Sequence, residues 1–136
     1  VEVFALVREL LTDDGVLTIN VGSVPGDRRL IDGLATTMST IYPSIHIMDI
    51  PGTLNTMIFA TKQPTVRDDF SNNLMVLAAD ENVDRLLIAA MSNTYLNLKE
   101  GYTPTTVFTD DLAPIEWIVN DMVVSFVLQG GLDFLQ

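Results

Sequence analysis

Hydrophobic positions near the start of the chain recur with a helical period and then merge into an unbroken run. The apolar side chains between Val3 and Leu11 fall on one helical face, and Asp13-Asp14-Gly15 ends this helix, with Gly15 free to take a positive φ. The run from Val16 to Val21 is typical of a β-strand that is covered on both faces. We therefore expect a helix followed by an interior strand, with one edge that later strands of this chain leave unpaired.

A second helix and two more strands follow. Asp27 is placed to cap a helix that Pro43 ends, and the inward positions of that helix are expected at Leu30, Ile31, Leu34, Met38 and Ile41. Alternating residues predict strands over 45–50 and 57–62. The short link Pro51-Gly52-Thr53 makes them antiparallel neighbours or near neighbours. The alternation of helix and strand predicts an α/β layer fold with helices packed on a sheet.

Beyond Pro64 the pattern becomes helical. Residues 67–73 are polar, and a helix is expected over 83–98 with inward side chains at Val83, Leu86, Leu87, Ala90 and Met91. A last helix is expected from Pro114 to about Gln129, where Gly130-Gly131 stops it. We therefore divide the chain into residues 1–64, which carry the sheet, and residues 65–136, a helical appendage packed on the same domain.

Composition and charge exclude several classes of function. The 136 residues suit one domain, and 7 basic against 18 acidic residues give a net charge of -11, which repels nucleic acid and anionic lipid. The chain has no cysteine, so it has no disulfide, no thiolate metal site and no cysteine nucleophile. The apolar stretch 115–128 is too short to span a bilayer, so we interpret it as a packed helix and do not expect a membrane partner for this chain. The cytoplasm is the default location.

Candidate binding residues lie where the strands end. Asn20 closes the first strand, and ligands in α/β sheets bind beyond the carboxyl ends of strands, although the commoner role of a strand-end amide is to satisfy the loop. Gly52 and Thr53 lie in the loop between the last two strands, where a turn needs the same residue types. Asn20, Gly52 and Thr53 are therefore the substrate-binding candidates.

Other polar residues have structural explanations. Arg28 and Arg29 follow a helix-start acid and are expected to be solvated, and His46 stands without the partners that a metal site or a catalytic relay needs. Asp110, Asp111 and Glu116 invite an amine-binding or acid-base interpretation, but helix capping explains them better. Trp117 and Phe126 are expected to pack.

Four segments carry a family resemblance: LLTDDGVLTINVG, DRRLIDGLATTMSTIYP, IHIMDIPGTLNTMIFATKQP and VFTDDLAPIEWI. Together they resemble spermidine synthase-like proteins, the polyamine aminopropyltransferase family. The resemblance implies the C-terminal half of an S-adenosylmethionine-dependent methyltransferase-like Rossmann sheet, in a three-layer α/β/α arrangement with a helical C-terminal appendage. Asn20 falls where typical members carry a glutamine near the substrate amine, and the 51–53 loop falls where they carry a tyrosine.

The resemblance also implies a reaction for the parent protein. It is the transfer of an aminopropyl group from decarboxylated S-adenosylmethionine, the co-substrate, to a polyamine. The catalytic acid and the glycine-rich cofactor loop would lie upstream of Val1, so we expect this chain to bind no cofactor and to be inactive alone. Family members dimerise, and the open strand edge also favours a homodimer. The alternative is a non-catalytic dimerisation or docking module with the same fold.

Overall fold

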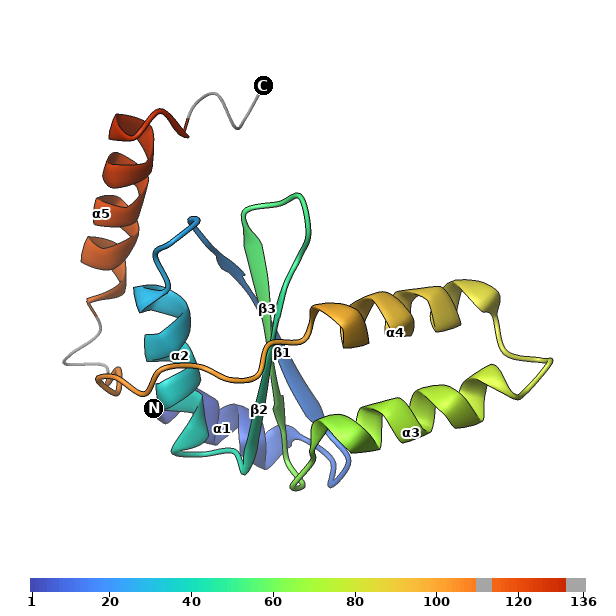
Figure 1. Cartoon of the computed structure of the whole chain (residues 1–136). Coiled ribbons are helices and arrows are strands. Elements are labelled where there is room, and N and C mark those ends of the chain that lie inside the picture. The colour runs from blue at the N-terminus through green and yellow to red at the C-terminus, as the bar shows by residue number, and fades with distance from the viewer. Residues whose placement is uncertain (110–113, 132–136) are drawn as a thin grey trace.

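The computed structural model describes residues 1–109 and 114–131 of the chain. Helices and strands alternate through its first half, and helices alone follow in the second half (Figure 1). The elements are α1 (Glu2–Leu10), β1 (Val16–Gly22), α2 (Arg29–Ser39), β2 (Ser44–Asp49), β3 (Asn55–Thr61), α3 (Arg67–Ala78), α4 (Arg85–Asn97) and α5 (Ile115–Leu128). The α/β class expected from the sequence is therefore confirmed.

The three strands form one sheet in the order β1-β3-β2. Strand β3 pairs antiparallel with both neighbours, in a register that sets Ile58 opposite Ile19 on one side and opposite Ile47 on the other. The antiparallel pairing of β2 and β3 confirms the sequence expectation. Since both outer strands run against β3, β1 and β2 run in the same direction and their carboxyl ends meet at one edge of the sheet.

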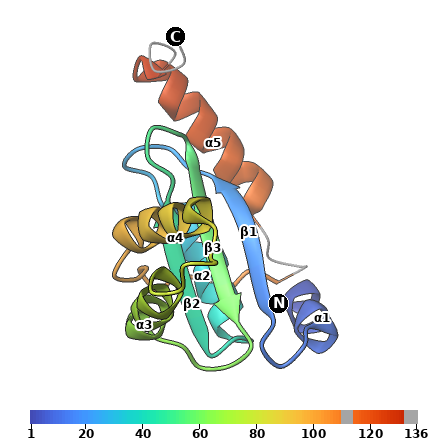
Figure 2. The ribbon, with the colours of Figure 1, turned by 90° about the vertical axis from the view of Figure 1, so that its right-hand side faces the viewer.

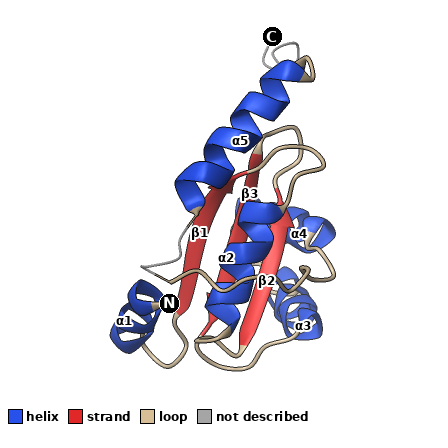
Figure 3. Ribbon diagram, turned by 90° about the vertical axis from the view of Figure 1, so that its left-hand side faces the viewer, coloured by secondary structure: helices blue, strands red, loops and turns tan. Residues whose placement is uncertain are grey.

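The hydrophobic core lies between α2 and the nearer face of the sheet, here called the inner face (Figure 3). Ile31 and Met38 of α2 are completely buried, and so is Ile58 of β3, while Ile47 of β2 is 1% exposed. Burying one such side chain contributes roughly 1.5–3 kcal/mol, so this layer dominates the stability of the fold. The inward face predicted for α2 is confirmed at its most buried positions, Leu30, Ile31 and Met38.

Strand β1 departs from the prediction that both of its faces are covered. Leu17 and Ile19 pack against the core on the inner face, but Val16, Thr18 and Asn20 point to the opposite face and are exposed. The expected open edge is present, because β1 has β3 as its single neighbour within the described ranges. The unbroken apolar run therefore does not mark an interior strand in this structure.

Helix α1 also buries fewer of its apolar side chains than the sequence pattern predicts. Phe4 and Leu11 pack against the core, whereas Leu6 and Leu10 are 57% and 79% exposed. The positive φ expected of Gly15 is wrong. A Cβ at Gly15 would lie 2.7 Å from the Cβ of Leu11, so glycine is needed there for space.

The second face of the sheet, here called the outer face, is approached by a helical hairpin formed by α3 and α4 (Figures 1 and 2). Neither helix has a fully buried residue, and the two pack mainly on each other. At the base, the ring of Phe70 stacks on that of Tyr95 with centroids 6.2 Å apart, and the Arg67 guanidinium lies 4.6 Å from the Tyr95 ring centroid. The rest of the hairpin projects away from the sheet.

Both helices of this hairpin differ from the sequence analysis. Helix α3 lies on a stretch for which the sequence analysis noted only polar residues and placed no helix, and it begins with a capping contact in which the Asp69 carboxylate accepts a hydrogen bond from the backbone N–H of Val66 at 2.8 Å. In α4, Leu86 and Leu87 are 75% and 48% exposed instead of inward. The partly buried positions of α4 include Ile88, Met91 and Tyr95.

Residues 98–109, here called the strap, return the chain from the hairpin to α2. The strap starts at the edge of β2, where the Lys99 N–H donates to the carbonyl of Ile47 at 2.8 Å. It then crosses α2, and the Phe108 N–H donates to the buried Thr37 hydroxyl at 2.8 Å (Figure 3). A Cβ at Gly33 would lie 2.1 Å from the Phe108 ring, so only glycine at this position lets the strap approach.

Helix α5 follows the strap, contacts α2 and extends beyond it (Figure 3). Ile118 and Met122 are its buried residues, and its bounds match the predicted last helix. Asp110 and Asp111, which the sequence suggested as caps, lie outside the described residues. No helix in ranges 1–109 and 114–131 has the length and apolar character needed to cross a membrane.

Candidate functional site

The carboxyl ends of β1 and β2 bring two loops together. Residues 23–28 follow β1 and residues 50–54 follow β2. The Ser23 N–H donates to the carbonyl of Leu54 at 2.9 Å, which joins the two loops. Gly26 and Gly52 have φ values of 83° and 71°, a region that favours glycine, so the sequence permits both tight turns. This edge is where α/β folds place ligands.

The carboxylate of Asp49, the last residue of β2, organises this edge. Arg28 donates from Nη1 to both Asp49 oxygens at 3.2 and 3.1 Å, and the Thr56 hydroxyl donates at 2.7 Å. Lys99 Nζ lies 3.2 Å from Asp49 Oδ2. Burial opposes the charged form, but the hydrogen bonds from Thr56, Arg28 and Lys99 outweigh it and lower the pKa of Asp49. One carboxylate thus links β2, β3, α2 and the strap.

Arg28 has donor capacity left over. Its Nη2 atom is buried and has no hydrogen-bond partner within the part of the chain that the structure describes. Next to it lies a hollow of about 250 Å³, which Ser23, Thr53 and Asn55 also line. Two cations around one carboxylate leave this cluster with a local excess of one positive charge. The Arg28 guanidinium thus adds a positive charge to the wall of the hollow, while its Nη2 atom itself is shielded from solvent.

The structure brings together only part of the predicted site. Thr53 lines the hollow, but its hydroxyl serves the turn, donating to the carbonyl of Ile50 at 2.9 Å and accepting from the Asn55 N–H at 3.2 Å. Gly52 is next to it and supplies the positive φ of the turn. Asn20 lies apart, exposed on the outer face of the sheet opposite Met57. A role for these residues in substrate binding stays a prediction.

Arg28 and Arg29 are partly exposed, as the sequence suggested, but both have ion-pair partners, which the sequence analysis did not predict. Arg28 pairs with Asp49, and Arg29 pairs with Asp27 and with Asp121 of α5. Asp27 also accepts a hydrogen bond from the backbone N–H of Arg29 at 3.1 Å, although the N-cap position itself is Arg28. The Arg28–Asp49 ion pair was predictable, because Arg28 follows the end of β1 and Asp49 ends β2. The contacts to Lys99 and Asp121 depend on the return of the chain, which no local pattern reveals.

The remaining candidates behave differently from one another. His46 lies half-buried on the outer face, and its Nε2 atom is 2.8 Å from the Thr65 hydroxyl. Trp117 was expected to pack, but it is 63% exposed. No group of three or more potential metal-ligating side chains occurs within residues 1–109 and 114–131.

Comparisons with known proteins give one distant relationship. The chain is 24% identical over 128 residues to a protein of Bifidobacterium longum (strain NCC 2705) described as a probable polyamine aminopropyl transferase. The match covers 85% of this chain and 29% of that protein, so the chain spans less than a third of its relative's length. No family model matches, and no solved structure matches. The similarity supports a relationship to polyamine aminopropyl transferases.

Proposed function

We propose that this chain forms one part of a polyamine aminopropyl transferase, an enzyme that moves an aminopropyl group from decarboxylated S-adenosylmethionine to a polyamine. The similarity to the Bifidobacterium protein over 128 residues carries the proposal. The sheet supports it, because an antiparallel β3 lies between two strands that run in the same direction. This strand arrangement is the one expected at the C-terminal end of a methyltransferase-like Rossmann sheet.

Within such an enzyme, this chain would contribute scaffold and pocket wall. Asp49 is a positioning residue, because its oxygens already accept from Arg28 and Thr56 and its lowered pKa makes it a poor proton acceptor. It fixes the loops at 23–28 and 50–54, where Thr53 lies. The turn between β1 and α2 contains Gly22 and Gly26 but lacks the G-x-G-x-x-G spacing that holds a nucleoside cofactor, so the donor molecule would bind to another part of the enzyme.

The open edge of β1 is where the rest of the sheet would join. The Ser23 N–H bonds to Leu54 and the Lys62 N–H bonds to the carbonyl of Gly15, so the odd-numbered residues of β1 face β3. The backbone groups of Val16, Thr18, Asn20 and Gly22 therefore point to the open side. The strand has no proline or lysine to discourage pairing. Helix α1 lies beyond this edge in Figures 2 and 3, where its exposed Leu6 and Leu10 would cover an added strand.

A transfer assay tests the proposal. Two samples are incubated with decarboxylated S-adenosylmethionine and putrescine. The first is the 136-residue chain alone, and the second is the full-length protein that its gene encodes. We expect release of methylthioadenosine and formation of spermidine in the second sample only. Absence of aminopropyl transfer to any of putrescine, cadaverine and spermidine in the second sample would refute the transferase assignment, and turnover by the first would refute the need for other parts.

The role of Asp49 is tested in the active sample by Asp49→Asn, with Asp84→Asn as a control. Asp84 caps α4 at a distance from the sheet edge, where its Oδ1 accepts from Leu86 N at 2.8 Å. We expect Asp49→Asn to raise the KM for the amine by about tenfold or more, because the loops lose their anchor, and to leave the pH profile unshifted. A shifted profile would instead identify Asp49 as an acid-base group.

The second candidate function is a non-catalytic association module, and the α3–α4 hairpin favours it. Met75, Val76 and Leu86 are 63%, 72% and 75% exposed, and no residue of either helix is buried. Apolar surface of this kind is typical of interaction sites. The proposed homodimer would bury the hairpin or the β1 edge. Light scattering across a concentration series should then show a dimer, and a monomer at every concentration would exclude it.

A further inference from the structure

A pocket of about 280 Å³ lies on the outer face of the sheet, where the base of the α3–α4 hairpin approaches the strands (Figure 2). His46 of β2 and Phe59 of β3 line its sheet side, and Phe70 of α3 and Thr94 of α4 line its hairpin side. All four side chains are partly buried. Segments that are far apart in the sequence therefore form this pocket together.

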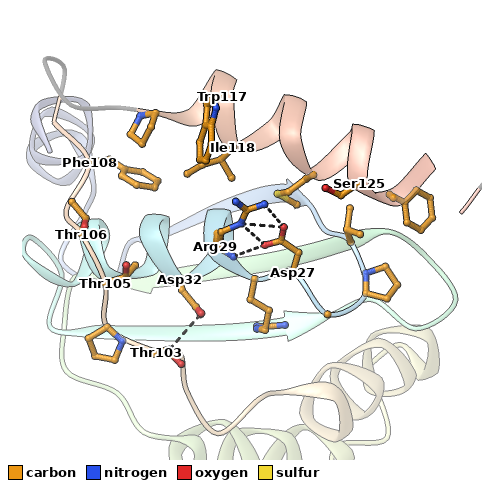
Figure 4. A pocket seen from close by; sticks show the side chains of 18 of the residues that line it. Asp27, Arg29, Asp32, Thr103, Thr105, Thr106, Phe108, Trp117, Ile118 and Ser125 are labelled. Carbon is orange, nitrogen blue, oxygen red and sulfur yellow. Dashed lines mark hydrogen bonds and ion pairs between the residues drawn. The ribbon is translucent and has the colours of Figure 1, made fainter. Parts of the chain in front are cut away.

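The pocket is separate from the candidate site at the sheet edge. Val16 begins β1, Thr61 ends β3 and both line the pocket, so it lies at the opposite end of the strands from the loops at 23–28 and 50–54. It is also separate from the groove between α2, the strap and α5, where the Arg29 guanidinium lies between two carboxylates (Figure 4). The pocket shares no lining residue with either place. A ligand here would leave the proposed transferase site untouched.

A chain of hydrogen bonds along the pocket wall fixes the tautomer of His46. The Thr61 hydroxyl donates its one proton to the carbonyl of Gln63 at 2.7 Å, so the 3.0 Å bond between the hydroxyls of Thr61 and Thr65 is donated by Thr65. The Thr65 proton is then used, and the 2.8 Å bond between Thr65 and His46 Nε2 must be donated by the imidazole. Neutral His46 therefore carries its proton on Nε2 and has a lone pair on Nδ1.

The Nδ1 atom of His46 is the acceptor that the pocket leaves open. It has no hydrogen-bond partner in ranges 1–109 and 114–131, and it is not among the buried atoms that lack one, so solvent reaches it. The side chains of Arg67, Asp69 and Thr94 also line the pocket, but each already bonds to a backbone atom in or next to the hairpin. The charges of Arg67 and Asp69 cancel, which favours an uncharged ligand.

The rest of the wall is largely apolar. Phe59, Phe70 and Leu98 line the pocket and keep part of their surface exposed. Burial lowers the pKa of His46, so its imidazole is neutral at pH 7. A cavity of about 150 Å³ holds benzene, so this pocket of about 280 Å³ has room for two fused rings. Such walls suit a flat, uncharged ligand that offers a single proton donor.

We propose that this pocket binds a small, uncharged aromatic molecule with one N–H or O–H group, of the chemical class of indole and naphthol. The rings would lie against Phe59 and Phe70, and the donor would bond to Nδ1 of His46. Because neither α3 nor α4 has a fully buried residue, a ligand between sheet and hairpin would also tie the hairpin to the strands. Binding should therefore slow amide exchange in α3.

Calorimetry on the full-length protein that the gene encodes tests the proposal with two probes. Indole carries the N–H group, and benzofuran has the same shape without a donor. We expect saturable heat with both, and an affinity for indole about fivefold or more above that for benzofuran, the contribution of one hydrogen bond. Absence of saturable heat with indole would overturn the proposal, and equal affinities would overturn the bond to His46.

His46→Leu separates that hydrogen bond from a structural role of the histidine. The substitution removes the acceptor and keeps an apolar side chain of similar reach. Indole binding should fall to the level of benzofuran, while benzofuran binding should change less than about twofold, because benzofuran makes no such bond. Equal weakening of both probes would show that His46 only shapes the pocket, which contradicts the proposed contact.

A matched pair of variants on α4 locates the ligand. Thr94→Phe places a ring in the pocket, whereas Asn93→Phe adds the same ring at the neighbouring exposed position, which does not line it. Thr94→Phe should weaken indole binding by about tenfold or more, and Asn93→Phe by less than about twofold. Equal effects would place the bound indole elsewhere and refute the assignment. If the Thr94→Phe ring displaces the hairpin in circular dichroism and amide exchange, the two probes on His46→Leu still decide.

Discussion

On the inner face of the sheet, helix α2 alone buries six residues, whereas neither α3 nor α4 on the outer face buries any. Both faces belong to the same three strands, so the difference lies in the alternation along each strand. Ile19, Ile47 and Ile58 point inward, while Thr18 and His46 point outward beside Phe59. A sheet whose apolar residues gather on one face is stabilised mainly from that side.

The strap connects the two sides. It begins at β2, where Leu98 forms a bridge with Met48, and ends against α2 at Phe108. The N-terminal amino group of Val1 also donates to the carbonyl of Phe108 at 3.0 Å. The strap thus carries the chain from the weakly covered outer face to the well-packed inner face, and it should share the stability of the side on which it ends.

The largest difference between the two sides should appear on truncating apolar residues. Ile58→Ala removes a completely buried side chain of the central strand and should cost about 2–5 kcal/mol, because it leaves a cavity between β3 and α2. Leu86→Ala on the hairpin, 75% exposed, should change stability by less than about 0.5 kcal/mol. Urea unfolding followed by circular dichroism measures both.

Similar losses of stability for Ile58→Ala and Leu86→Ala would show that the hairpin is packed as well as the core. The two faces of the sheet would then not differ in stability. If Ile58→Ala does not fold, Ile58→Val provides the same test on a smaller scale, with an expected cost of about 0.5–1.5 kcal/mol.

The next effect concerns the close approach of the strap to α2. Gly33→Ala places a methyl group 2.1 Å from the present position of the Phe108 ring, so the ring and strap must move away. We expect a net loss of about 1–3 kcal/mol despite the better helix propensity of alanine. The unfolding midpoint gives the loss, and an increased rate of amide exchange at Phe108 locates it. A more stable variant would show that the strap is not held against α2.

A single hydrogen bond on the strap should give a smaller loss. Thr37→Val keeps the buried shape but leaves the Phe108 N–H without its acceptor. Because the strap can shift toward water, we expect a cost of about 1 kcal/mol, the low end for an unpaired buried donor. Thr36→Val is the matched control, because Thr36 accepts from the Thr105 N–H at 3.0 Å near the surface, where water replaces the bond. Equal losses in thermal unfolding would place both bonds in the same environment.

Much of the inner layer was predictable from the sequence, because local periodicity determines it. The spacing of Leu30, Ile31 and Met38 predicted the buried face of α2, and the Pro51-Gly52-Thr53 link predicted antiparallel pairing of β2 and β3. These features depend on residues close in the chain. Where one element needs only its neighbours to bury its apolar face, pattern and structure agree.

Features that depend on distant segments were missed. Leu6 and Leu10 belong to the apolar face of α1, yet none of the described residues covers them. Leu86 of α4 is likewise exposed, because no described segment packs against that side of the helix. Helix α3 was missed because its polar residues obscured a helical spacing of Phe70, Leu74 and Leu77, all partly buried. At the candidate site, the sequence placed Thr53 in the loop between β2 and β3, where it lies, but Lys99 reaches Asp49 only because the strap returns there.

The smallest effect we predict is a pH dependence of stability that arises from His46 on the outer face. His46 is on the outer face, close to Thr65, with Asp69 and Arg67 of α3 also lining the adjacent pocket. Burial lowers the pKa of His46, and the nearby Asp69 carboxylate only partly offsets it. The unfolded chain therefore takes up a proton at the usual histidine pKa of about 6.5 before the folded protein does, and stability falls as the pH drops from there to the lower folded value.

His46→Gln should abolish this part of the pH dependence while matching the parent protein at pH 8. Urea unfolding between pH 5 and 8 measures the slopes, and identical slopes in the two proteins would show that the outer face leaves His46 open to water.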